Sequence, residues 1–168
     1  MIILGLDPAI RTTGYGVVEM LPGMRTKILD CGVIKNTQQM PHSDCVRRLA
    51  GGVRELINAF HPDCASLESP FVGDNAKTAI ILGMARGAIL TALADAGVAA
   101  YAYTPIEAKR AATGISHARK EQVALLMANE FGISAADIPN DATDALALAV
   151  CHGQKALQTQ LDLIGKPL

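Results

Sequence analysis

Short apolar runs and helical periods alternate along the chain in an order typical of an α/β protein. Strands are predicted where apolar runs lie between turn signals, and the Pro22–Gly23 turn joins two of them into a meander with the first. A helix is predicted where Val46, Leu49 and Val53 recur on one face. The predicted strands are 2–7, 15–20, 26–34, 64–67 and 98–103, and the predicted helices are 43–59, 75–96, 105–112, 118–131 and one from about 141.

These elements predict one domain, residues 1–157, followed by a loose C-terminal tail, residues 158–168. Half of the 168 residues are hydrophobic and 18% are charged, which excludes a disordered chain. We expect no membrane partner, because no uninterrupted apolar run is long enough to cross a bilayer. The four cysteines are scattered and have no metal-ligand spacing, which indicates reduced thiols in a cytoplasmic protein.

Four carboxylates stand where predicted strands end or where the last helix begins. Asp7 and Glu68 each close a strand, and Asp141 and Asp144 open the helix. Strands joined by helical crossovers are parallel and end at one sheet edge, so Asp7 and Glu68 can approach one ion if their strands are neighbours. Residues three apart share a helix face. Oxygen ligands suit Mg²⁺ or Mn²⁺, and such sites commonly act on phosphate esters.

Each carboxylate also has an ordinary structural explanation. Asp141 would be favourable at a helix N-terminus as a cap or dipole partner, whereas Asp144 lies too far in to cap. Glu68 could be a surface acid, and Asp7 could begin an Asx turn. All four having ordinary roles together is the less consistent reading, so a divalent-cation site is the hypothesis.

The charge balance permits a nucleic-acid partner without requiring one. The net charge is −1, which by itself speaks against such a partner. If four of the 16 acidic residues bind metal, 12 remain against 15 basic residues. Arg11, Lys77 and Arg86 are candidate phosphate contacts. His117 and His152 are interpreted as non-catalytic.

Six segments resemble the RuvC family of Holliday junction resolvases. The first, Gly-Leu-Asp-Pro-Ala-Ile-Arg-Thr-Thr-Gly-Tyr-Gly-Val, contains Asp7, and the second, which begins Leu-Glu-Ser-Pro-Phe, contains Glu68. The segments fall in family order and cover nearly the whole chain: 5–17, 67–79, 82–87, 103–109, 119–123 and 141–147. Together they are highly specific, although the first alone would not be.

The resemblance implies a ribonuclease-H-like α/β fold, here with a five-stranded mixed sheet flanked by helices. It implies a homodimeric, metal-dependent endonuclease that resolves four-way DNA junctions by paired symmetric hydrolysis in recombination and repair. Two Mg²⁺ ions are expected, and Mn²⁺ can substitute. The family usually works with the RuvA–RuvB branch-migration complex. The family's catalytic and metal-binding carboxylates match Asp7, Glu68, Asp141 and Asp144, its basic active-site residues match Lys109 and Lys120, and its base-contacting aromatic matches Phe71.

Two other function classes fit part of the pattern. A strand that ends in Asp before a hairpin also suits an actin-like or sugar-kinase-like phosphotransferase, but 168 residues leave no room for the second nucleotide-binding lobe. A catalytically inactive junction-binding module is the other alternative, and the intact acidic set counts against it. Small residues along 75–96 permit close helix packing in a dimer, and burial against the sheet explains them equally well.

Overall fold

The computed structural model of the chain describes residues 1–70, 75–131, 134, 138–157 and 166–168. Within these residues, strands and helices follow the predicted order. The strands are β1 (Ile2–Asp7), β2 (Thr12–Met20), β3 (Thr26–Lys35), β4 (Cys64–Glu68) and β5 (Ala99–Tyr103). The helices are α1 (His42–Phe60), α2 (Ala76–Asp95), α3 (Pro105–Thr113), α4 (Lys120–Phe131) and α5 (Asn140–Leu157), with a 3₁₀ turn at Pro22–Met24.

The strands form one mixed sheet in the order β3-β2-β1-β4-β5. β2 pairs antiparallel with both β1 and β3, because short turns connect it to each of them. β4 and β5 run parallel to β1, because α1 and α2 return the chain to the starting side of the sheet. The five-stranded mixed sheet expected from the sequence is confirmed, and β1 and β4 are adjacent.

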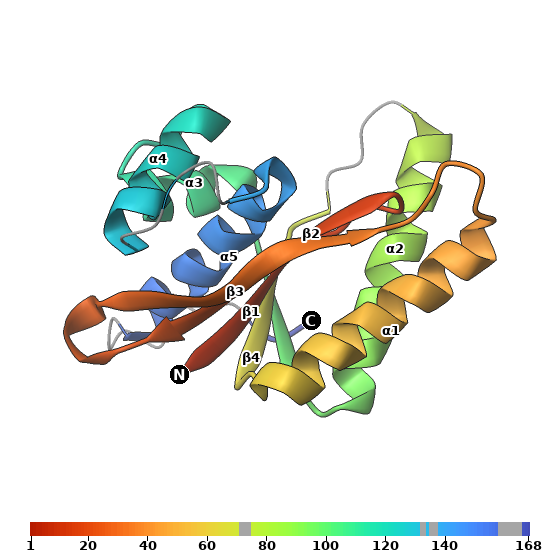
Figure 1. Cartoon of the computed structure of the whole chain (residues 1–168), viewed down its shortest axis with the longest axis horizontal. Coiled ribbons are helices and arrows are strands. Elements are labelled where there is room, and N and C mark those ends of the chain that lie inside the picture. Colours follow the sequence, from red (N-terminus) through yellow and green to blue (C-terminus); the bar gives the residue numbers. More distant parts are fainter. Residues whose placement is uncertain (71–74, 132–133, 135–137, 158–165) are drawn as a thin grey trace.

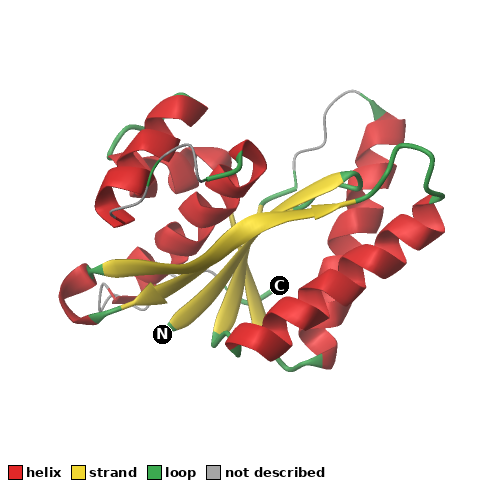
Figure 2. Cartoon of the chain, in the orientation of Figure 1, coloured by secondary structure: helices red, strands yellow, loops and turns green. Residues whose placement is uncertain are grey.

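Helices cover both faces of the sheet (Figures 1 and 2). α1 and α2 pack on one face, and α3, α4 and α5 lie on the other. The α1 side of the core contains Leu49 and Val53 with Leu4 and Leu6 of β1. The α5 side contains Leu146 and other apolar residues of α5 packed against β1 and β2. α5 is therefore a central helix laid directly on the strands that carry the N-terminal motif.

One expectation needs correction at the edge of an element. β2 begins at Thr12 rather than at residue 15, because the antiparallel ladder continues to the pairs Asp7–Gly14 and Thr12–Lys35. The connection between β1 and β2 is therefore limited to residues 8–11. At the predicted loose tail, the backbone N–H of Leu168 donates a hydrogen bond of 2.9 Å to the carbonyl of Ala100 in β5. Residues 158–165 of that predicted tail lie outside the described part, so the loose tail stays a prediction.

By length and composition alone, α2 is long and apolar enough to cross a membrane, although Lys77 and Arg86 interrupt its apolar run. One such helix is weak support for a membrane span, since helices of soluble domains pass the same test. α2 packs on α1, and its Arg86 donates to the carbonyl of Glu68 in the sheet. Most of α2 is nevertheless not buried, so much of its apolar surface remains uncovered in the single chain.

Candidate active site

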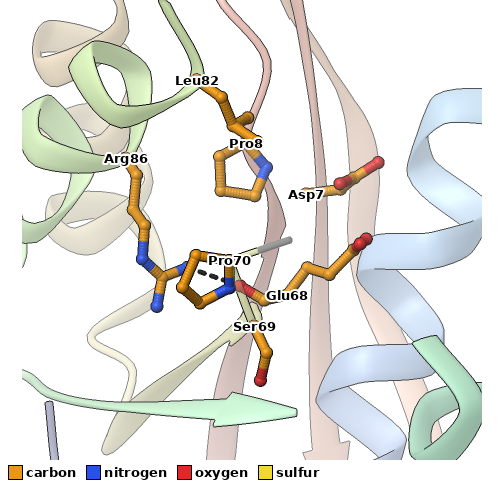
Figure 3. A pocket seen from close by; sticks show the side chains of 7 residues that line it. All are labelled: Asp7, Pro8, Glu68, Ser69, Pro70, Leu82 and Arg86. Atoms are coloured by element: carbon orange, nitrogen blue, oxygen red, sulfur yellow. Dashed lines mark hydrogen bonds between the residues drawn. The ribbon is translucent and has the colours of Figure 1, made fainter. Parts of the chain in front are cut away.

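Asp7 and Glu68 lie side by side at the carboxyl ends of neighbouring parallel strands. The register places Leu6 beside Leu67, and each acid is the last residue of its strand. Both side chains are half-buried. They point the same way, toward α5 (Figure 3). The expected proximity of these two carboxylates follows from the pairing of β1 with β4.

Two glycines bring α5 close enough to the sheet to carry its own acids to this edge. A Cβ added at Gly14 would lie 1.6 Å from the carbonyl oxygen of Asp141, and one at Gly5 would lie 1.9 Å from that of Ala145. Only residues without a side chain allow such an approach. Gly14 is also the partner of Asp7 in the β1–β2 ladder. The first turns of α5 are therefore seated on the strand pair that ends in Asp7.

Two cavities meet at Glu68. One, of about 120 Å³, lies between the strand ends and α2 (Figure 3). Its lining consists of Asp7, Pro8, Glu68, Ser69, Pro70, Leu82 and Arg86. The other, of about 220 Å³, lies between the same strand end and helices α3 and α5. Its lining consists of Glu68, Pro105, Ala108, Lys109, Asp144, Ala147 and Leu148. Glu68 thus lines both cavities: it shares the first with Asp7 and the second with Asp144 and Lys109.

The structure places the side chain of Lys109, one of the two basic residues expected at the active site, in the second of these cavities. It is half-buried and lines the cavity that also contains Glu68 and Asp144. An ammonium group there can attract a phosphate to the carboxylate edge. Lys120 is the first residue of α4, and Lys77 is exposed in the first turn of α2. Phe71, the predicted base-contacting aromatic, lies outside the described residues.

The guanidinium groups of Arg86 and Arg11 both contact backbone carbonyls. Arg86 donates from α2 to the carbonyl of Glu68 (Figure 3). Burial lowers the pKa of Arg86, and the nearby Glu68 partly opposes that shift. Arg11 donates to the carbonyls of Thr37 and Met40, in the loop before α1. Sequence reasoning missed these contacts because no motif marks a backbone acceptor so distant along the chain; contact of either arginine with DNA stays a prediction.

His152 lies in the core rather than at the carboxylates. It is 3% exposed, and its Nδ1 forms a hydrogen bond of 2.8 Å with the hydroxyl of Tyr103. Burial, assisted by the positive charge of Lys155, lowers the pKa of His152 to about 4. His152 is therefore neutral at pH 7. His117 is exposed on the segment before α4.

Among the described residues, no group of three or more His, Cys, Asp or Glu side chains is placed to hold a metal ion. Asp7, Glu68 and Asp144 line the two cavities as oxygen donors. Mg²⁺ retains waters and is held by one or two carboxylates together with substrate phosphates. Carboxylates along an open edge, with Lys109 beside them to attract phosphate, match that preference.

Comparison with known proteins identifies the family. Residues 3–152 match the family model described as crossover junction endodeoxyribonuclease RuvC. The RuvC of Chlorobaculum parvum is 41% identical over 90% of this chain and 80% of the relative, and that of Chloroflexus aurantiacus is 38% identical over 91% and 93%. The solved structure of Thermus thermophilus RuvC in complex with Holliday junction substrate is 34% identical, with a TM-score of 0.88, over 100% of this chain and 99% of the other. This agreement confirms the ribonuclease-H-like fold. The chain belongs to the RuvC family of crossover junction endodeoxyribonucleases.

Proposed function

We propose that this member of the RuvC family resolves four-way DNA junctions by paired, symmetric hydrolysis of phosphodiester bonds at the edge formed by β1, β4 and α5. The observation that carries the proposal is the position of Glu68, which stands beside Asp7 in the sheet and shares a cavity with Asp144 and Lys109. Carboxylates from β1, β4 and α5 and a lysine from α3 thus line two adjoining cavities, and such groups can serve the hydrolysis of a charged ester.

Members of this family are metal-dependent nucleases. We infer two Mg²⁺ ions, with Mn²⁺ able to substitute, held by Asp7, Glu68, Asp141 and Asp144. When bound, such ions supply Lewis-acid stabilisation of the phosphate and a lowered pKa for the attacking water. The chain's own groups orient the reaction: the strand-end carboxylates of Asp7 and Glu68 are fixed by the sheet, so they need little reorganisation when the phosphate arrives.

DNA binding is proposed to use basic residues around this edge. Lys109 would neutralise the scissile phosphate or the charge of the transition state, and Lys120 would do so from the start of α4. Lys77, Arg11 and Arg86 are further phosphate candidates, and Phe71 is the candidate to stack on unpaired bases near the branch point. Two Mg²⁺ ions would change the net charge of the chain from −1 to about +3. We therefore expect junction affinity to rise with metal.

A second copy of the chain is the proposed partner of α2. Its uncovered side presents, at helical spacing, the exposed residues Ile80, Gly83, Gly87, Thr91 and Ala94. A Cβ added at Gly83 or Gly87 meets no atom within 4 Å, so this surface is open in the single chain. Small residues let two helices approach closely. A two-fold dimer would supply two sites in matched orientation for a nearly two-fold symmetric junction.

The dimer is tested with Gly87→Glu, which places a charge on that surface without a clash inside the monomer. We expect sedimentation to show a folded monomer that cuts junctions poorly. Gly51→Glu, on α1 at a position equally open in the structure, is the matched control and should remain dimeric. A Gly87→Glu protein that stays dimeric would remove α2 from the interface.

We also propose that the protein acts in homologous recombination and DNA repair in the cytoplasm, together with the RuvA–RuvB complex. The four free cysteines, of which three are buried, are consistent with a reducing compartment. Adding RuvA–RuvB to junction cleavage reactions should increase resolution by this protein. An unchanged rate would speak against the partnership.

The main test uses a labelled four-way junction and a linear duplex, each with Mg²⁺ or EDTA. We expect paired, ligatable nicks only in the junction and only with metal. Asp7→Asn should abolish cutting and keep junction binding, whereas Asp44→Asn, a remote exposed acid on α1, should cut like the wild type. Retained cutting by Asp7→Asn would overturn the site assignment. Wild-type binding without nicking, in Mg²⁺ and in Mn²⁺, would favour the inactive junction-binding module.

A further inference from the structure

One carboxylate connects α3 to α5 beside the candidate active site. Glu107 lies in the first turn of α3, where its Oε2 accepts hydrogen bonds of 2.8 Å from both the backbone N–H and the hydroxyl of Thr104. The Thr104 hydroxyl in turn accepts from the backbone N–H of Glu107, which completes a capping box. The other oxygen, Oε1, lies 2.7 Å from the ammonium of Lys155 in α5. Glu107 therefore both caps α3 and attaches it to a second helix.

The position of Lys155 is itself defined by its surroundings. Its ammonium lies 4.6 Å from the centre of the Tyr103 ring, and its side chain is 25% exposed. Burial alone would raise the pKa of Glu107, but the hydrogen bonds from Lys155 and Thr104 together outweigh that effect and lower it. Glu107 is thus ionised at neutral pH. A second contact, from Gln154 to the carbonyl of Ala111 at 3.1 Å, holds the same two helices together.

These two helices also carry the functional groups of the cavity at Glu68. Lys109 follows Glu107 by two residues on α3, and Asp144 precedes Lys155 on α5. Both Lys109 and Asp144 line that cavity. Any rotation of α3 relative to α5 would therefore move Lys109 relative to the carboxylates. The described contacts that oppose such a rotation include the Glu107–Lys155 pair and the Gln154 hydrogen bond.

We propose that Glu107 and Lys155 are positioning residues for Lys109, holding α3 against α5 so that the Lys109 ammonium faces the carboxylate edge. This inference rests on the proposed role of Lys109 in cleavage. Neither Glu107 nor Lys155 lines the cavity, so both act through Lys109 and not on the phosphate. Ion pairs near the surface stabilise a fold only weakly, so stability is a poor measure of this pair and its coupling to Lys109 is the informative quantity.

The test is a double-mutant cycle on junction cleavage. Glu107→Gln keeps an acceptor for the cap and loses the ion pair, and Lys155→Met keeps the apolar part of the side chain. We expect each to lower kcat about tenfold, with junction affinity and melting temperature nearly unchanged, because small misplacements of a charged group are costly in catalysis. Lys109→Ala should lower kcat by about 10²-fold. In the Lys109→Ala background, Glu107→Gln should cause no further loss.

Two controls make the outcomes distinct. Lys155→Arg should restore much of the activity, and Asp95→Asn, which breaks the exposed Arg54–Asp95 pair of 3.0 Å, should cut like the wild type. Two results would overturn the positioning role while leaving the role of Lys109 intact. One is that Glu107→Gln lowers kcat as much in the Lys109→Ala background as in the wild type. The other is that Glu107→Gln does not lower kcat at all. A Lys109→Ala protein that cuts normally removes the proposed role of Lys109, and this inference with it.

Discussion

Replacing Gly14 by alanine should displace the acids of α5 without altering any acidic side chain. The new Cβ would lie 1.6 Å from the carbonyl oxygen of Asp141, whereas a Cβ atom in a protein essentially never lies within 3.0 Å of such a heavy atom. β2 and the start of α5 would therefore have to separate by about 1.4 Å. The obstacle is backbone and not a flexible side-chain end, so neighbouring rotamers cannot relieve it.

The expected cost follows from that displacement. Overpacking a well-packed core typically costs about 1–3 kcal/mol, and a backbone clash belongs at the upper end. For a domain of this size, about 3 kcal/mol lowers the melting temperature by roughly 6–12 °C. A shift of about 1 Å in catalytic geometry can cost about 10²-fold in rate. We therefore expect Gly14→Ala to be folded at 25 °C and to cut junctions about 10²-fold more slowly.

The assay combines thermal unfolding with single-turnover cleavage of a labelled four-way junction at saturating protein. Gly51→Ala is the control, because a Cβ there meets no atom within 4 Å. It should cut normally and gain about 0.5–1 kcal/mol, since alanine is the better helix former. Wild-type cleavage by Gly14→Ala at an unchanged melting temperature would refute the close seating of α5. Lost stability with normal cleavage would restrict the role of Gly14 to folding.

Three further predictions concern Arg86, Arg11 and His152. Arg86→Met removes the donor to the Glu68 carbonyl, so single-turnover cutting should fall about 10-fold or more while junction affinity changes little; a loss of affinity alone would favour the phosphate-contact role. Arg11→Met removes donors to the carbonyls of Thr37 and Met40 and should lower the free energy of unfolding by about 1–3 kcal/mol, and a fully stable variant that binds junctions weakly would favour DNA contact. The folded-state pKa of His152, about 4, is below its ordinary 6.5, so the unfolded state binds the proton more readily between these values. Stability should therefore decrease from pH 6.5 toward pH 4, by up to about 3 kcal/mol, and the decrease should be smaller in His152→Gln; equal pH dependence in the two proteins would contradict the assignment.

Sequence patterns predicted the parts of the fold that depend on chain order. Apolar runs and turn signals identified the five strands, and the crossover rule placed the parallel strand ends at one edge. The adjacency of Asp7 and Glu68 followed from that rule once β1 and β4 were neighbours. The start of β2 was missed because glycines such as Gly14 are read as turn signals, whereas this one lies inside a paired strand.

Contacts between distant elements were beyond sequence reasoning. Thr104 and Glu107 have capping-box spacing, so their local contact was predictable in principle. Nothing in the pattern indicates that the same Glu107 would also meet Lys155, because that contact depends on how α3 crosses α5. The acceptors of Arg86 and Arg11 are backbone carbonyls, which carry no residue signature. Side-chain chemistry can suggest which groups react, but it does not say which groups hold them.

The placement of the acidic site depends strongly on Gly5 and Gly14, which carry no functional group. A carboxylate on α5 can serve the same ion as Asp7 only if the helix axis lies unusually near the sheet, and any side chain at Gly5 or Gly14 would increase that separation. The two glycines act at successive turns of α5, so they define its tilt as well as its distance. A substitution of Gly5 or Gly14 that displaces α5 should therefore impair cutting even though every acidic side chain is intact.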